Sequence, residues 1–371
     1  IAKPYLTKEE AQAAYDTILT GWITQGPKVQ EFEKKFAEYV GAKYAVATSN
    51  CTTALHLAMI VARIKAGDEV ICPSMSYIAT ANCIKYVNAI PVFAEVDKDY
   101  NLDAKHVESL ITNKTRAILV VHQMGMPADI DAFKALCNKH KLILIEDAAC
   151  AAGSSYKGKK IGSHSDLVCF SFHPRKVIST GDGGMICTSR EDYANRIKLL
   201  RQHGMSVNDR ERHTSSKIIF EEHLELGYNY RMTDIQASVG IKQLEKLDWL
   251  LAERRKIACK YHEAFKDIKG LQLPIEKADY ESNYQSYSIY LNEGIKIKRN
   301  DLMQILLDKG IATRRGIMCS HREPTYINEY KGLKLPISEN LQDRSILIPI
   351  FVPMSDEEIT QVVRGLKEAL A

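Results

Sequence analysis

Two ionisable side chains stand shortly after predicted buried strands, where they could act on one ligand. Asp147 follows the apolar residues 142–146, and Lys176 lies in the segment SFHPRKVISTGDGG, just past another apolar run. A carboxylate at the position of Asp147 could keep a pyridinium nitrogen protonated, as pyridoxal-phosphate sites require, or it could cap a helix or join a salt bridge. Most loop lysines are solvated charges, but partial burial could lower the pKa of Lys176 enough for a Schiff base.

Hydroxyl and aromatic residues occur at other expected strand ends, and they could hold a phosphorylated ring. Thr52 and Thr53 open a predicted helix, where hydroxyls and free backbone N–H groups would make either a phosphate site or a plain N-cap. Ser171 precedes Lys176 in the same segment and could add a further hydroxyl. Tyr77 follows CPSMS and could stack on a flat ring or pack in the core.

The elements that would position these residues alternate between strand and helix. Apolar runs predict strands at residues 44–47, 69–73, 89–96, 116–122, 142–147, 166–172 and 183–188. Helical patterns are expected at residues 8–19, 29–40, 52–64, 77–87 and 129–140. Fully apolar strands alternating with helices predict an α/β fold with a mainly parallel sheet covered on both faces. Ligands then bind beyond the carboxyl ends of the strands.

The C-terminal third has its own pattern of strands and helices. A single long helix is expected over about residues 233–265, as a bridge between two domains. Strand, helix and strand patterns follow in QSYSIYLNE, RNDLMQILLDKG and ATRRGIM, and a capping box at Ser355 opens the last helix. We predict a large domain at residues 1–245, including a polar interface loop at 201–234. Residues 246–371 would form most of the bridging helix and a small C-terminal α/β domain.

Composition argues against several classes of protein. The 371 residues include 50 Lys+Arg and 46 Asp+Glu, and a formal charge of +4 gives no sign of a nucleic-acid partner. No apolar run approaches the roughly 20 residues of a membrane span. Nine cysteines without a CxxC pair, and no signal-peptide pattern, predict a reducing, cytoplasmic setting. P-loop, GxGxxG, HExxH and GxSxG motifs are absent, and the histidines lack metal-ligand spacing, so no metal is expected.

Six ordered motifs make the chain recognisable: GWITQGPKVQEFE, SNCTTALHLA, CPSMSYIATAN, IEDAAC, SFHPRK with TGDGG, and GYNYRMTDIQA. With the C-terminal GIATRRGIMCSHREP and PIFVPMSDEE, they resemble the DegT/DnrJ/StrS family of pyridoxal-phosphate-dependent nucleotide-sugar aminotransferases. The resemblance spans essentially the whole chain. It implies the fold-type I aminotransferase architecture: a large seven-stranded cofactor domain, a smaller C-terminal domain, and a homodimer.

The resemblance assigns a role in binding pyridoxal 5'-phosphate to several motif positions. Lys176 matches the Schiff-base lysine, Asp147 the partner of the pyridine nitrogen, and Tyr77 the ring that stacks on the cofactor. The positions that match phosphate contacts are Thr52, Thr53, Ser171 and, from the neighbouring subunit, Asn229. The active sites would therefore be shared across the dimer.

Some positions depart from the family pattern or are less specific. Cys51 stands where many relatives have Gly, and Cys150 where many have Gln or His near the cofactor's hydroxyl; both are expected at the cofactor's edge. The candidates for the donor carboxylate or the sugar pyrophosphate are Arg231, Arg314, Arg315 and His321.

The reaction that the resemblance implies is transamination with glutamate as amino donor. The acceptor would be a nucleotide-linked keto-6-deoxy sugar, with the 4-keto group as first expectation, in biosynthesis of an amino sugar for a surface polysaccharide or glycan. Lys176 would carry the proton as general acid and base. Two alternatives stay open: a family member that acts on a cyclitol or another small ketone, and a non-catalytic member that has kept the fold.

Overall fold

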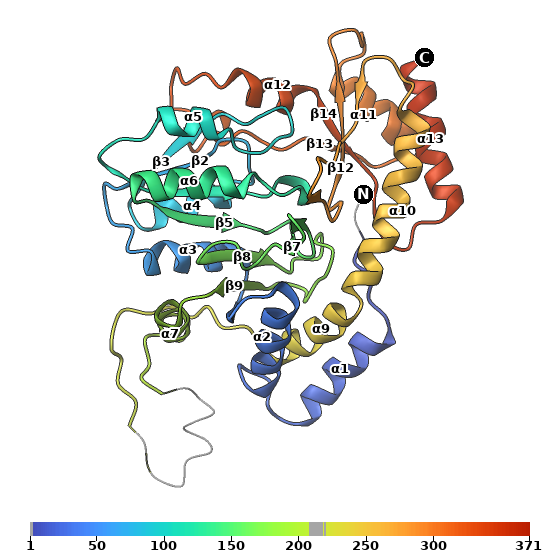
Figure 1. Ribbon diagram of the computed structural model, residues 1–371. Coiled ribbons are helices and arrows are strands. Elements are labelled where there is room, and N and C mark those ends of the chain that lie inside the picture. The colour runs from blue at the N-terminus through green and yellow to red at the C-terminus, as the bar shows by residue number, and fades with distance from the viewer. Residues whose placement is uncertain (1–2, 208–217, 219) are drawn as a thin grey trace.

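A seven-stranded sheet forms the centre of the protein, as described by a computed structural model that covers residues 3–207, 218 and 220–371 (Figure 1). The strand order is β1-β9-β8-β5-β4-β2-β3. The strands are β1 (Tyr44–Thr48), β2 (Glu69–Pro73), β3 (Ile90–Ala94), β4 (Thr115–Val121), β5 (Ile143–Asp147), β8 (Leu167–Ser171) and β9 (Gly184–Thr188). Only β9 runs antiparallel to its neighbours in this sheet. The predicted mainly parallel sheet is confirmed.

Helices cover both faces of this sheet, which explains why its strands are apolar throughout. One face packs against α2 (Pro27–Val40), α5 (Ala104–Ser109), α6 (Ile130–His140) and α9 (Asp234–Glu245). The other packs against α3 (Cys51–Val61), α4 (Ala79–Tyr86) and α7 (Glu191–Leu200). Successive strand residues alternate between the two cores: Ile71 faces the first, and Val70 and Cys72 face the second. All three are fully buried, as expected for a parallel sheet covered on both sides.

A second, antiparallel sheet lies in the C-terminal third, with the order β10-β12-β14-β13. Its strands are β10 (Leu271–Gln272), β12 (Tyr287–Leu291), β14 (Ser345–Ile348) and β13 (Arg314–Arg315). Helices α10 (Leu247–Phe265), α11 (Arg299–Asp308) and α13 (Asp356–Leu370) pack beside it. A small third sheet joins β11 (Tyr280–Glu281) to β6 (Ser155–Tyr156) and β7 (Lys159–Lys160). The predicted smaller α/β unit is therefore present; the boundary at 245/246 stays a prediction.

The single helix predicted over residues 233–265 is wrong, because the structure has two helices that meet at Lys246. There φ is −97° and ψ is −6°, away from ordinary helical values. The Lys246 ammonium donates hydrogen bonds to Thr7 Oγ1 at 2.8 Å and to Glu10 Oε1 at 2.7 Å. These contacts fasten the junction to α1 (Lys8–Leu19), and α10 then leaves in a new direction (Figure 1). Apolar periodicity continues across such a junction, so the sequence pattern alone does not reveal it.

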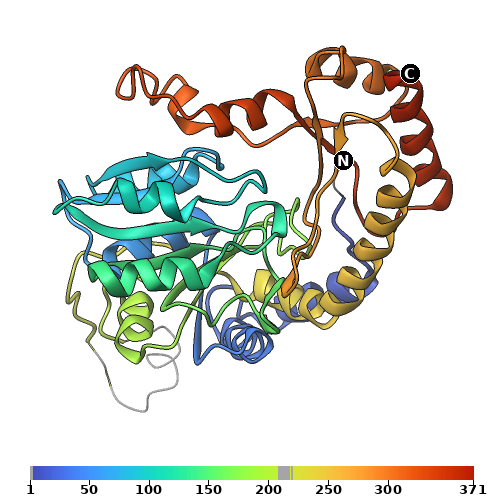
Figure 2. The ribbon, with the colours of Figure 1, turned by 45° about the horizontal axis from the view of Figure 1, so that its top comes forward.

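One segment of the C-terminal third lies against the large sheet as well as the small one (Figure 2). It runs from the short helix η2 (Ser320–Arg322) through α12 (Pro336–Arg344). The Tyr326 hydroxyl donates to Asn82 Oδ1 at 2.7 Å, and the Ser338 N–H donates to the buried Glu95 Oε1 at 2.7 Å. This segment ties the two parts of the fold together at the edge of the large sheet. Among the described residues, none of the helices has the length and apolar character needed to cross a bilayer.

Candidate active site

The site predicted from the sequence lies where β5 and β8 end side by side. Asp147 is the last residue of β5, Ser171 is the last residue of β8, and Lys176 follows in the next loop. Asp147 and Ser171 are buried, whereas Lys176 is partly exposed. Parallel neighbours bring their carboxyl ends to one edge of the sheet, so these residues meet although they are far apart in sequence.

Asp147 is held by a chain of buried hydroxyl groups. The Thr80 hydroxyl donates to Asp147 Oδ2 at 2.8 Å, and the Ala149 N–H donates to Oδ1 at 3.1 Å. Ser76 Oγ lies 2.7 Å from Thr80 Oγ1 and extends the chain. Burial raises the pKa of Asp147 above its usual value, and the hydrogen bonds from Thr80 and Ala149 and the Lys176 charge oppose that rise. A cationic partner, such as a pyridinium N–H, would favour the ionised form.

Lys176 has a neighbour that the sequence did not pair with it. Its Nζ lies 3.1 Å from Cys150 Sγ. Burial acts to lower the pKa of Lys176, but the adjacent Cys150 and the charge of Asp147 act in the opposite direction and leave the pKa raised. The sequence-based expectation of a lowered pKa is therefore wrong for the free lysine, because these acidic groups outweigh the burial.

The loop around Lys176 is held by a glutamine from the C-terminal third. Gln285 Oε1 accepts a hydrogen bond from the Val177 N–H at 3.0 Å, and Gln285 Nε2 donates to the Arg175 carbonyl at 2.5 Å. The Ser179 N–H donates to Gln243 Oε1 at 3.2 Å. Side-chain amides therefore satisfy backbone groups on both sides of the lysine, which fixes its position without regular secondary structure.

The start of α3 offers free donors beside this pair. Asn50 caps the helix, because its Oδ1 accepts from the Thr53 N–H at 2.9 Å. The Thr53 hydroxyl donates to the Asn50 carbonyl at 2.8 Å, so it serves the cap. The N–H groups of Cys51 and Thr52 precede the first helical hydrogen bond and remain available to an anion. Gly184 allows the main chain at Asn50 to pack closely against β9, because a Cβ at position 184 would lie 2.5 Å from the Asn50 carbonyl oxygen.

Two further predicted cofactor contacts differ in exposure. The Tyr77 side chain is 66% exposed and stands just before α4, so its ring is free to cover a ligand. Cys51 is the first residue of α3 and is buried; burial first, and then the charge of Asp147, raise the pKa of its thiol. Cys51 therefore remains a neutral, small packing group.

The predicted substrate residues differ in whether their side chains already have hydrogen-bond or ion-pair partners within the protein. His321 is buried, with Nδ1 2.6 Å from Ser74 Oγ and Nε2 3.2 Å from Glu339 Oε1, so both ring nitrogens have protein partners. Arg315 donates to Glu323 Oε1 at 3.3 Å. Arg314, by contrast, is an exposed residue. The part of its side chain that is shielded from water, and after that the nearby Arg175 charge, lower its pKa.

Two more predicted residues lie in the polar interface loop at 201–234. Asn229 is exposed and bridges to Gln202 through its backbone, and Arg231 is partly buried. The Ser49 N–H donates to the Tyr230 carbonyl at 2.8 Å, which places this strand-like segment beside the start of α3. Residues 208–217 and 219 of the predicted interface loop at 201–234 lie outside the described residues.

Sequence reasoning missed Thr80 and Gln285, although both touch the site. Thr80 lies in the quoted motif CPSMSYIATAN, and a hydroxyl one helical turn after Ser76 was its only local signal. Gln285 opens the segment QSYSIYLNE, whose strand pattern gives no sign of a role at the site. Its position 108 residues after Val177 becomes meaningful only once the two sheets are docked.

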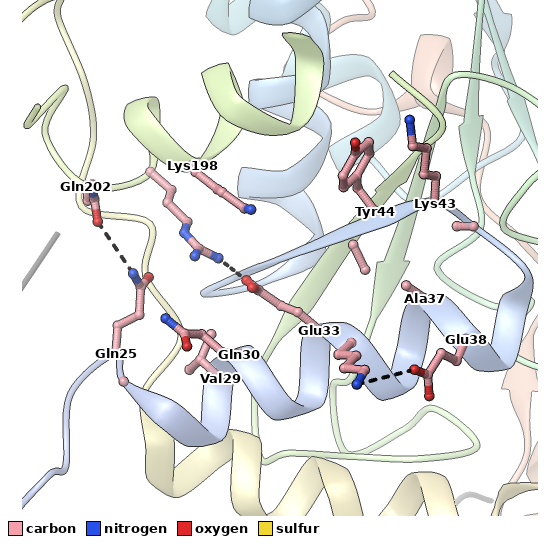
Figure 3. Close-up of a pocket in the computed structure, with 15 residues that line it drawn as sticks. Gln25, Val29, Gln30, Glu33, Ala37, Glu38, Lys43, Tyr44, Lys198 and Gln202 are labelled. Atoms are coloured by element: carbon pink, nitrogen blue, oxygen red, sulfur yellow. Dashed lines mark hydrogen bonds and ion pairs between the residues drawn. The ribbon is translucent and has the colours of Figure 1, made fainter. Parts of the chain in front are cut away.

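A cavity of about 550 Å³ elsewhere contains none of the predicted residues (Figure 3). It lies between α2, β1 and the end of α7, where Arg201 forms an ion pair with Glu33. Arg201 Nη1 also donates to the Ala47 carbonyl at 2.6 Å. These contacts tie α2 and α7 to the edge strand, which is a structural task.

The donor set at the sheet edge fits pyridoxal phosphate. It combines an amine at Lys176, a buried carboxylate at Asp147 that is suited to a cationic ring nitrogen, and a helix start with two free N–H groups. No group of three or more metal-ligating side chains occurs among the described residues.

Comparison with known proteins supports this interpretation. The model of the DegT/DnrJ/EryC1/StrS aminotransferase family matches residues 4–367. The spore coat polysaccharide biosynthesis protein SpsC of Bacillus subtilis is 37% identical over 370 residues, which cover 98% of this chain and 95% of SpsC.

Solved structures agree with the chain along its length. The putative sugar aminotransferase Spr1654 from Streptococcus pneumoniae, in its PMP-form, has a TM-score of 0.93 and 28% identity, covering 99% of this chain and 98% of Spr1654. Spr1654 has also been solved in a PLP-form. DesI, solved in the presence of its TDP-sugar product, has a TM-score of 0.88 and 28% identity, with coverage of 99% and 91%. The chain therefore belongs to the DegT/DnrJ/EryC1/StrS aminotransferase family, and it is a pyridoxal-phosphate-dependent aminotransferase.

Proposed function

We propose that the protein transfers the amino group of glutamate to a nucleotide-linked keto-6-deoxy sugar, at a 4-keto group. The product would be an amino sugar for a surface polysaccharide or glycan. Support for the acceptor comes from the relatives, since SpsC is a polysaccharide biosynthesis protein and DesI was solved with a TDP-sugar product. The structural observation that supports transamination is that Asp147, at the end of β5, and Lys176, in the loop after the neighbouring strand β8, lie at the same edge of the sheet.

Each residue of the site has a proposed task toward the cofactor. Bound pyridoxal phosphate would supply an electron sink for the carbanion that forms when the substrate loses a proton. Asp147 stabilises the protonated ring nitrogen, and the Thr80 hydroxyl keeps the carboxylate in place. Tyr77 covers the ring. The phosphate is held by the start of α3 and by nearby hydroxyls, from Thr52 and Ser171, and from Thr53 once its hydroxyl turns away from the Asn50 carbonyl.

Lys176 is proposed as the cofactor-attachment residue and as the general acid and base. Its loop is held on both sides by Gln285, so the amine can return to one position after each proton transfer. A proton-transferring group must lie within hydrogen-bond reach of the substrate carbon, and a rigid loop meets that demand. Cys150 lies close enough to influence the amine's charge before the cofactor is bound.

We further propose a homodimer in which Asn229 reaches the cofactor phosphate of the neighbouring subunit. The exposed position of Asn229 in the single chain is compatible with such a contact. The cytoplasmic setting suggested by the unpaired cysteines likewise stays a prediction.

The decisive experiment is product analysis by mass spectrometry. The purified, cofactor-loaded protein is incubated with glutamate and a panel of nucleotide-linked 4-keto and 3-keto 6-deoxy sugars, with cyclitol ketones in parallel. We expect the mass of an amino sugar nucleotide and release of 2-oxoglutarate. Amination of a cyclitol or a small ketone alone would refute the sugar-nucleotide assignment, and another amino acid acting in place of glutamate would refute the donor.

A further inference from the structure

Two arginines on segments that border the site have side chains without a carboxylate or carbonyl partner in the described part of the chain. Arg175 directly precedes Lys176, and Arg314 opens β13; both residues are exposed. Neighbouring arginines are paired, since Arg315 contacts Glu323 at 3.3 Å and Arg322 contacts Asp343 at 2.9 Å. Unpaired guanidinium groups beside a catalytic lysine are suited to a substrate anion.

The fold brings the loop that carries Arg175 and the strand that carries Arg314 toward each other. Gln285 holds the backbone of Arg175, and Ser288 follows in β12. Ser288 pairs with Leu347 of β14, and Leu347 pairs with Arg314 of β13. Arg314 is therefore two strand spacings, about 10 Å, from the strand that is anchored to the Lys176 loop.

The chain beyond β13 then crosses the loop that carries Tyr77. The Ser76 N–H donates to the Met318 carbonyl at 3.1 Å, and the Ser320 N–H donates to the Ser74 carbonyl at 2.7 Å. Arg314 thus lies on a segment that borders the cofactor site on one side, while Arg175 borders it on another.

The charges of Arg175, Arg314 and their neighbours act on one another. Burial, and after it the Arg175 charge, lower the pKa of Arg314. The pKa of His173 is also lowered, mainly by burial. The charges of Arg175, Lys176 and Arg314 lower it further, and the charge of Asp182 acts in the opposite direction. Positive charges held close together repel one another, and a bound anion between them would offset this repulsion by attracting each of them.

We propose that Arg175 joins Arg314, a candidate already named from the sequence, in an anion subsite near Lys176, which holds the carboxylate of the amino donor or the diphosphate of the nucleotide-linked acceptor. Both anions present planar or tetrahedral oxygen groups that guanidinium forks bind with paired hydrogen bonds. The choice of these two anions rests on the proposed function. The subsite itself rests on the unpaired side chains and their placement.

The test uses Arg175→Ala and Arg314→Ala, with Arg322→Ala as the control variant on the same segment. In the first arm, the loaded enzyme reacts with glutamate alone, and the change in cofactor absorbance gives the KM and rate of that half-reaction. In the second arm, UDP and TDP are titrated into the enzyme by calorimetry. We expect both variants to raise either the KM for glutamate or the Kd for a nucleoside diphosphate roughly 10- to 100-fold, with the Arg322 variant near wild type.

A readout without ligand separates binding from a structural role. Because each substitution removes a repulsive charge, the Tm of the variants without substrate should be unchanged or higher. The subsite is overturned if neither arm responds, or if the Tm falls and Arg322→Ala gives the same kinetic loss. If the wild-type enzyme binds neither nucleotide and aminates no nucleotide sugar, the proposed acceptor is wrong, and the subsite then stands or falls on the glutamate arm alone.

Discussion

Thr80→Val probes most directly how the protein keeps Asp147 ionised. The variant preserves the shape of the side chain but removes the hydroxyl that lies 2.8 Å from Asp147 Oδ2, which leaves the carboxylate with the Ala149 N–H at 3.1 Å. A hydrogen bond to a charged group contributes about 1.5–3 kcal/mol. We therefore expect the Kd for pyridoxal phosphate to rise roughly 10- to 100-fold, with a similar fall in kcat/KM.

The sign of the pH dependence follows from the same contact. The Thr80 hydrogen bond lowers the pKa of Asp147, so its loss raises a pKa that burial has already raised. The carboxyl group is then protonated at a higher pH, and a neutral acid does not stabilise a cationic ring nitrogen. The defect of the variant should be largest in acid and should shrink as the pH rises.

The assay is titration of the apo-protein with pyridoxal phosphate at several pH values, followed by absorbance, with Thr80→Ser as the matched control that keeps the hydroxyl. Ser76 also loses a partner in the valine variant, so thermal unfolding of both variants is measured to confirm that they fold. Wild-type affinity and kcat for a folded Thr80→Val across this pH range would refute the role assigned to the hydroxyl.

Four further predictions follow from particular contacts. Lys176→Ala should lose the visible absorbance of the bound cofactor and all transamination; retention of both would contradict its assignment. Cys150→Ala should lower the pKa of Lys176, and so speed cofactor attachment to the apo-protein at neutral pH but not above the lysine's pKa, as stopped-flow absorbance would show. Mixing Lys176→Ala with Asn229→Ala subunits should restore activity if Asn229 serves the neighbouring site, and no restoration would place it in its own. Arg201→Met should cost about 3–5 kcal/mol in urea unfolding, because the buried carboxylate of Glu33 loses its counter-charge; a loss below 1 kcal/mol would make this ion pair unimportant.

Much of the fold and part of the site follow from local sequence signals. Apolar runs with helical stretches between them predict the strands of the large sheet, because a doubly covered sheet demands apolar residues at consecutive positions. Asp147 could be placed at a strand end because it terminates such a run, and Ser171 could be placed within the last two residues of another. The capping box at Ser355 is also formed, since it depends on residues three positions apart.

What the sequence could not supply is contact between distant segments. The expectation of a lowered lysine pKa failed because its sign depends on Cys150 and Asp147, which reach Lys176 from another strand end. The contacts of both His321 ring nitrogens with Ser74 and Glu339 were likewise out of reach of the sequence, and a substrate role for His321 stays a prediction. Periodicity carries no record of such partners, since it reports only which face of an element is apolar.

The distance between Cys150 and Lys176 illustrates how the C-terminal third completes the site. Asn283 Nδ2 donates to the Cys150 carbonyl at 2.8 Å, and Gln285, two residues later, holds the backbone on both sides of Lys176. One short stretch therefore fixes the thiol and the amine relative to each other. Because neither Asn283 nor Gln285 touches the amine itself, they control its charge through position alone. The reactive residues at the edge of the large sheet thus depend on side-chain amides of the segment that leads into β12 of the small sheet.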